Sequence, residues 1–155
     1  MFEAVRDFFC RVTAEHAAAG PAAGQRAVQL AAAALLFEIV RADGEVRPEE
    51  LTVMRAGVQG TFGLSAEDTE ALMAMAEGES RSAISLFEFT RVVDEAFDEE
   101  QKKRIVELLW LVAFADARKD AHEEHLIRQI ATLLHVRHPD FIDAKIRARE
   151  RSGEA

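Results

Sequence analysis

The sequence is poor in residues that cross-link or interrupt a chain. Its 155 residues include one cysteine, three prolines, one tryptophan and no tyrosine. The single cysteine, Cys10, excludes an internal disulfide and fits a reducing compartment. Basic residues are also scarce, 19 against 28 acidic ones, so the formal net charge is −9. This acidity argues against a general nucleic-acid binder, because binding along a phosphate backbone needs clustered positive charge.

Long hydrophobic runs are missing as well. The longest uncharged stretch, residues 27–37, is far shorter than the roughly 20 residues that cross a bilayer. Charged residues at positions 3, 6 and 7 are atypical of a secretory signal peptide. We therefore expect a cytoplasmic protein with one domain over residues 1–155, no nucleic-acid partner and no direct insertion into a membrane.

The residues that are abundant favour helices. Alanine is frequent, and apolar residues recur at helical rather than strand spacing. The pattern predicts an all-α bundle of seven to eight helices, with residues 1–23 forming an N-terminal helix and linker, and GESRS (78–82) forming a loop. Further helices are expected at residues 25–42, 48–62, 65–77, 85–97 and 98–115. Apolar residues at 126, 127, 130 and 134 mark a seventh helix, and a short last helix is expected from Pro139.

The chain contains an internal repeat. Two strongly apolar helices each end in Ala-Asp, and the two aspartates, Asp43 and Asp116, are 73 positions apart. Further on, FGLSAED (62–68) matches LHVRHPD (134–140) at an offset of 72. Similarity at a nearly fixed offset indicates a duplication. We expect two halves, residues 25–79 and 85–151, packed around a pseudo-twofold axis.

The turn after the first apolar helix has the spacing of the second half of a calcium-binding EF-hand loop. In order, an aspartate, a glycine, a hydrophobic residue and a glutamate take the fifth, sixth, eighth and twelfth places: Asp43, Gly44, Val46 and Glu50. Glycine permits the sharp turn, and the hydrophobic residue is expected to anchor it. The first and third places fall on Ile39 and Arg41, which cannot bind calcium, so a normal EF-hand is excluded.

The second turn keeps Asp116 and, seven residues later, Glu123, but has Ala117 and Lys119 in place of the glycine and the hydrophobic residue. If the repeat brings both turns together, four carboxylates converge. Oxygen ligands of this kind suit calcium or magnesium, and zinc less well. The predicted metal ligands are Asp43, Glu50, Asp116 and Glu123. The alternative is metal-free: the aspartates end helices, and the glutamates interact with the positive N-terminal ends of the next ones.

Two further motifs leave alternatives open. The run HEEH could form a zinc site from His122, Glu123 and His125 with Asp116 or Asp120, although metalloproteases space their histidines four apart. The simpler interpretation is a solvated helix face. Near the C-terminus, four cations (Lys145, Arg147, Arg149 and Arg151) could contact an acidic partner. Favourable charge at a helix C-terminus is the simpler account.

The duplicated segments resemble the tellurite-resistance TerB-like family. The resemblance lies in LLFEIVRADGEVRPEEL and LLWLVAFADARKDAHEEHL, with support from LSAEDTEAL and DEEQKKRIVELL, and spans about residues 25–146. It implies a bacterial, cytoplasmic, all-helical bundle of two pseudo-repeated halves with a metal site at the acidic turns. Carried over residue by residue, that site falls on the same four carboxylates. Ala117 and Lys119 depart from the pattern, and a lysine there would repel a cation.

The resemblance implies no enzymatic activity and predicts no catalytic or cofactor-binding residue. It extends to the N-terminal helical domain of a membrane-anchored J-domain co-chaperone, which implies use as an interaction module. The leading hypothesis is a stress-response protein that binds a divalent cation and acts through a protein partner, in metal or envelope stress. The alternatives are a metal-free adaptor and, least favoured, a zinc hydrolase built on HEEH.

Overall fold

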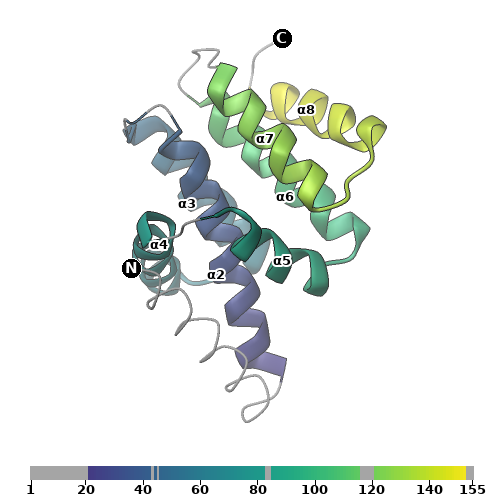
Figure 1. Ribbon diagram of the computed structural model, residues 1–155. Coiled ribbons are helices and arrows are strands. Elements are labelled where there is room, and N and C mark those ends of the chain that lie inside the picture. The colour runs from purple at the N-terminus through teal and green to yellow at the C-terminus, as the bar shows by residue number, and fades with distance from the viewer. Residues whose placement is uncertain (1–20, 43, 45, 83–84, 116–120, 153–155) are drawn as a thin grey trace.

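The computed structural model describes residues 21–42, 44, 46–82, 85–115 and 121–152, and within these ranges it contains helices and no strands (Figure 1). The expected all-α class is thereby confirmed. The helices are α2 (Pro21–Val40), α3 (Pro48–Phe62), α4 (Ala66–Ser82), α5 (Phe87–Ala96), α6 (Glu99–Phe114), α7 (Ala121–Leu133) and α8 (His138–Ser152).

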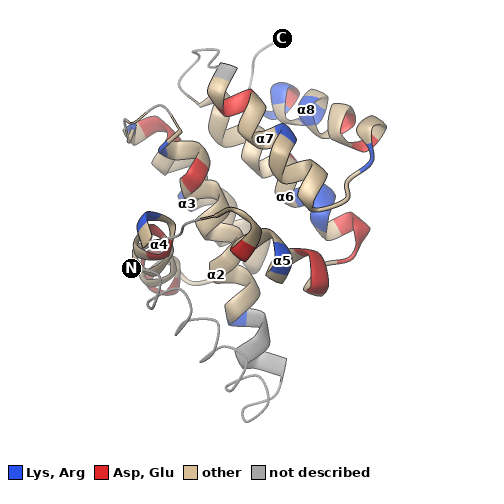
Figure 2. Cartoon of the chain, in the orientation of Figure 1, with Lys and Arg blue, Asp and Glu red and all other residues tan. Residues whose placement is uncertain are grey.

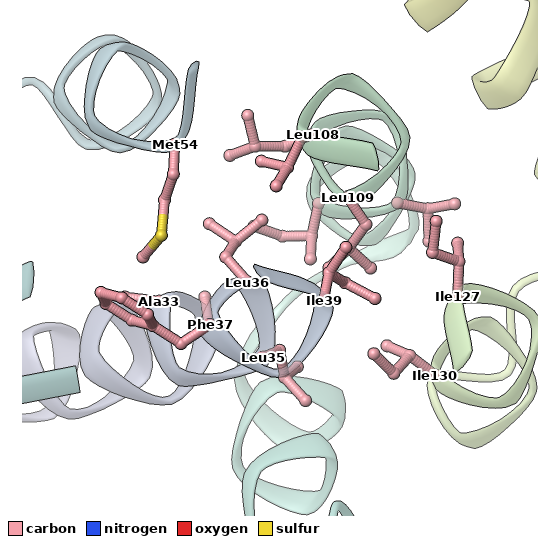
Figure 3. Close-up of a cluster of buried hydrophobic side chains, with 14 of the residues drawn as sticks. Ala33, Leu35, Leu36, Phe37, Ile39, Met54, Leu108, Leu109, Ile127 and Ile130 are labelled. Carbon is pink, nitrogen blue, oxygen red and sulfur yellow. The ribbon is translucent and has the colours of Figure 1, made fainter. Parts of the chain in front are cut away.

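Helices α2 and α6 form the centre of the bundle. Almost every residue of α2 from position 27 onward is buried, as is most of α6 after position 104. Helices without a polar face must be surrounded, and α2 packs against α3, α4, α5, α6 and α7, while α6 packs against α2, α3, α7 and α8. In the resulting core, Leu36 and Leu109 come from the two central helices, and Met54 and Ile127 enter from α3 and α7 (Figure 3). One hydrophobic cluster therefore extends through both halves.

Two helix endings match each other in the backbone at nearly the offset found in the sequence. Helix α3 is followed by Gly63 at φ 64°, and α7 by His135 at φ 61°, 72 positions later. One residue further, the N–H of Leu64 donates to the carbonyl of Gln59 (3.2 Å), and the N–H of Val136 to that of Ala131 (3.0 Å). Both sets form the left-handed helix ending known as the Schellman motif. The packing follows the same symmetry, since α2–α4 corresponds to α6–α8 and α3–α6 to α7–α2.

Three expected helix bounds are wrong. Helix α2 begins at Pro21 instead of residue 25, because proline at the first helical position is compatible with a helix. Helix α4 continues through the predicted GESRS loop to Ser82, and α8, expected to be short, has 15 residues. The predicted N-terminal helix lies outside the described residues. None of the described helices has the length and apolarity to cross a membrane.

Candidate functional site

Two glutamates occupy equivalent, fully buried positions. Glu50 is the third residue of α3 and Glu123 the third residue of α7, and the two are 73 positions apart. Their exposed fractions are 0% and 2%. Glu49, the neighbour of Glu50, is exposed. In Figure 2, both helices begin at the upper end of the view, with acidic residues in their first turns.

Helical spacing explains why these glutamates, and not their neighbours, are buried. Glu50, Met54 and Val58 follow one another at intervals of four, so they share the face of α3 that packs on the core. Glu123 stands four residues before Ile127 in the same way, and Ile127 is fully buried. The spacing to Met54 and Ile127 in the sequence is thus a signal for burial of both carboxylates, in addition to the spacing of the acidic turns.

Burial of a carboxylate is unfavourable unless opposite charge or hydrogen bonds compensate it. Part of the compensation for Glu50 comes from Arg47, whose Nε lies 3.8 Å from Glu50 Oε1. Both glutamates also have polar or electrostatic interactions with other groups, so neither is isolated. Their place in the first turn adds the positive end of the helix dipole. Two buried, equivalent carboxylates are thus held at the N-terminal ends of two helices.

The other two predicted ligands, Asp43 and Asp116, lie outside the described residues, so the four-carboxylate arrangement stays a prediction. In the first turn, Gly44 follows Asp43 in the sequence. It has φ +85°, and its N–H donates to the carbonyl of Arg41 (3.0 Å). Glycine is needed for this left-handed turn, as expected. Val46, however, is 46% exposed and does not anchor the turn in the core. The turn resembles an EF-hand loop in sequence spacing but not in its hydrophobic anchor.

The side chains of the HEEH run do not share one face of α7. His122 and His125 are exposed, whereas Glu123 between them is buried. Among the described residues, no three His, Cys, Asp or Glu side chains lie together as a metal-binding group, although Asp116 and Asp120 fall outside that set. The described geometry therefore supports a solvated helix face for the two histidines.

Sequence reasoning missed a polar network between α2 and α4. Ser80, which is 3% exposed, donates to Glu38 Oε1 (2.8 Å) and accepts from Arg41 Nη1 (2.8 Å). Burial raises the pKa of Glu38, while the Ser80 hydrogen bond and the nearby Arg41 charge act in the opposite direction. The network holds the end of α2, just before the first acidic turn, against the last part of α4. No local sequence signal could have found it, because Ser80 lies 39 positions or more from both partners.

Comparison with known proteins shows which family has this sequence pattern. The model of the family described as tellurite resistance protein TerB matches residues 29–146. This match covers α2 from residue 29 onward, all of α6, both glutamates and most of the chain. The chain belongs to the TerB family. The predicted resemblance is therefore confirmed.

A solved relative supports the fold of this TerB-family chain. It is a protein of unknown function from Porphyromonas gingivalis W83, with 22% sequence identity and a TM-score of 0.59. The similarity covers 79% of the present chain and 94% of the other. At this level of identity, the similarity bears on the fold alone. No curated protein matches the sequence.

Proposed function

We propose that this TerB-family chain is a non-enzymatic module that binds a divalent cation through its two acidic turns. The observation that carries the proposal is the complete burial of Glu50 and Glu123 at equivalent positions of the repeat. Two carboxylates at helix N-termini do not need burial to interact with a helix dipole, as the exposed Glu49 illustrates. Their burial is easier to understand if they belong to a site that excludes water.

The donor set fits a hard cation. With Asp43 and Asp116, the glutamates would supply only carboxylate oxygens, which suit calcium or magnesium better than zinc. A bound ion would neutralise the buried charge and link the two halves. Cation occupancy would then set the geometry of the helix ends that a partner contacts. We infer a role in cytoplasmic stress responses, including the tellurite resistance named in the family description.

The first test is a thermal melt of metal-stripped protein with calcium, magnesium, manganese or zinc added back. An ion that binds only the native state adds about 2.7 kcal/mol of stability at 100 times its dissociation constant. For a chain of this size, that corresponds to a rise in melting temperature of about 5–10 °C. We expect calcium or magnesium to give this rise, and Glu50→Gln and Glu123→Gln each to abolish it.

Glu49→Gln is the matched control, since it removes the same charge from the same helix turn at an exposed position. It should retain the full cation response. If both carboxylates bind one ion, either single change already removes the cation response, and the double variant Glu50→Gln/Glu123→Gln should show no further loss. No shift with any ion, or equal loss in Glu49→Gln, would leave a metal-free adaptor. A zinc-specific shift lost in His122→Ala would instead favour the HEEH site.

A further inference from the structure

Away from the acidic turns, a row of cations lies over a row of aromatic rings where α6, α7 and α8 meet. Trp110 lies between two phenylalanines, with ring centroids 5.5 Å from Phe114 and 5.5 Å from Phe141. A cation covers each ring: Arg149 lies 5.7 Å from Phe114, Lys145 4.9 Å from Trp110, and Arg128 5.3 Å from Phe141. All three distances are within the range of cation–π attraction. We call these six residues the cation–aromatic row.

The basic residues of α8 fall into two groups with different partners. Arg147 and Arg151 both pair with Glu107 of α6, whose single negative charge offsets about half of their positive charge. The Nζ of Lys145 lies 3.3 Å from Oε1 of Glu124 on α7, and the two form an ion pair. Figure 2 shows basic residues along α8, and three of the four have acidic partners in the described part of the chain.

Arg128 and Arg149 are different. Within the described part of the chain, neither guanidinium forms an ion pair with a carboxylate. Each guanidinium lies over a ring at cation–π distance, a contact that restrains the group while leaving N–H donors available to an oxygen acceptor. Prior ordering lowers the entropy lost when a ligand binds. The row therefore presents two ordered and unneutralised hydrogen-bond forks.

We propose that the cation–aromatic row is a docking surface for an acidic helical segment of a partner protein. Lys145 and Arg149 are four residues apart, which is a rise of about 6 Å along α8. Two glutamates four residues apart on a partner helix have the same rise, so one can bind Arg149 while the other joins or replaces Glu124 at Lys145. The carboxylate on Arg149 would be bound through two parallel N–H···O bonds, the geometry that arginine favours.

Two features of the molecule favour a short acidic segment over a larger polyanion. Trp110 and Phe141 are each 3% exposed, so their rings are covered and cannot stack on bases or insert into lipid. The net charge of −9 also repels an extended anionic surface. A short segment bound to the row samples mainly the local cations, because charges beyond about 8 Å are screened at physiological salt.

The test uses the full chain and its single tryptophan, Trp110, as the reporter. The probe is an alanine-based peptide of about 16 residues, long enough to form some helix, with glutamates paired four apart. A peptide with glutamine at those positions is its control. We expect the glutamate peptide to change Trp110 emission saturably and to bind about tenfold more tightly than the glutamine peptide, with affinity falling as salt increases.

The variants Arg128→Gln and Arg149→Gln should each weaken binding by about threefold to tenfold. Arg149→Lys, which keeps the charge and loses the fork, should weaken it too. Arg104→Gln is the matched control, because Arg104 is exposed on α6, outside the row, and the variant makes the same charge change. Calorimetric titration confirms each affinity, and circular dichroism confirms that each variant is folded.

Four results would overturn the proposal. The first is that the glutamate peptide does not bind at millimolar concentration. The second is that Arg104→Gln weakens peptide binding as much as the Arg128 and Arg149 variants do. The third is arginine-dependent binding of phosphatidylserine vesicles without binding of the peptide. The fourth is a concentration-dependent dimer dissociated by the Arg128 or Arg149 variants, which would make a second copy of the chain the occupant. The cation experiment above is read independently, because none of its variants lies in the row.

Discussion

Two glycines of α3, three residues apart, have different surroundings. A methyl group on Gly57 would overlap the side chain of Leu108 on α6, with Leu108 Cδ2 and Cγ 3.2 Å away. Leu108 is only 4% exposed, so it has little room to move. A methyl group on Gly60 would meet nothing within 4 Å. Gly57 therefore permits the close approach of α3 and α6, whereas Gly60 has no such role.

The two positions predict opposite effects of the same substitution. Gly60→Ala should stabilise the protein by about 0.5–1 kcal/mol, because alanine loses less backbone entropy in a helix. Gly57→Ala should destabilise it by about 1–3 kcal/mol, because overpacking outweighs that gain. Urea unfolding of both variants measures the two free energies. Equal stabilisation by both would mean that Leu108 moves aside freely.

At the scale of the helix, the two copies of the Schellman ending use different residues. Gly63 adopts φ 64° without strain, whereas His135 adopts φ 61° with a side chain. A left-handed conformation costs a residue with a Cβ about 1–2 kcal/mol. The His135 ring lies 3.0 Å from Asp94 but is 74% exposed, so this contact contributes little in return.

His135→Gly should therefore stabilise the protein by about 0.5–1 kcal/mol. His135→Ala removes the Asp94 contact but keeps the Cβ, so it is the matched control and should change stability little. Gly63→Ala should destabilise by about 1 kcal/mol for the same steric reason. Equilibrium unfolding compares the three. If His135→Gly were no more stable than His135→Ala, the ending of α7 would carry no backbone strain.

Local signals determined which helix bounds could be predicted. Pro48 and Gly63 bound α3 as expected, and Asp98 caps α6 through a capping box with Gln101, so the sequence alone located these ends. The continuation of α4 to Ser82 was not predictable in this way. Its last turns are supported by the hydrogen bonds of Ser80 to α2, which join residues distant in sequence.

The same limit applies to the candidate site. The offset of 73 identified Glu50 and Glu123 as equivalent, because a duplication is a property of the sequence. Their burial depends on which helix face meets the core. The sequence signal for that face is an apolar residue four positions after each glutamate, Met54 and Ile127. Whether the two acidic turns meet cannot be predicted from spacing within either turn, since it depends on how the halves pack.

At the scale of the whole molecule, the two halves have diverged where their outer helices pack. In the first half, the α2–α4 contact includes a polar network of Glu38, Arg41 and Ser80. The offset of 73 places Leu111 and Phe114 at the positions of Glu38 and Arg41, and the α6–α8 contact is aromatic and cationic. Acidic residues exceed basic ones in α4, and the reverse holds in α8. Similar helix pairs in the two predicted halves thus form two chemically different surfaces.

The polar contact of the first half gives the stability of the whole molecule a defined pH dependence. The pKa of Glu38 in the folded protein is raised above its ordinary value of 4.5, mainly by burial. Between the ordinary and the raised value, the folded state therefore holds a proton that the unfolded state has released. Folding stability then falls as pH rises through this interval, and the stability added by protonated Glu38 is fully present below pH 4.5.

Glu38→Gln should remove this contribution. Relative to the variant, the natural protein should gain stability as pH is lowered from about 7 towards about 4, as measured by urea unfolding at each pH. Ser80→Ala should steepen the dependence, because it removes the hydrogen bond that lowers the pKa of Glu38. Burial also raises the pKa of Glu88, so stability should fall less with rising pH in Glu38→Gln/Glu88→Gln than in Glu38→Gln. Parallel curves for the natural protein and Glu38→Gln would mean that Glu38 is as well solvated in the native state as in the unfolded chain.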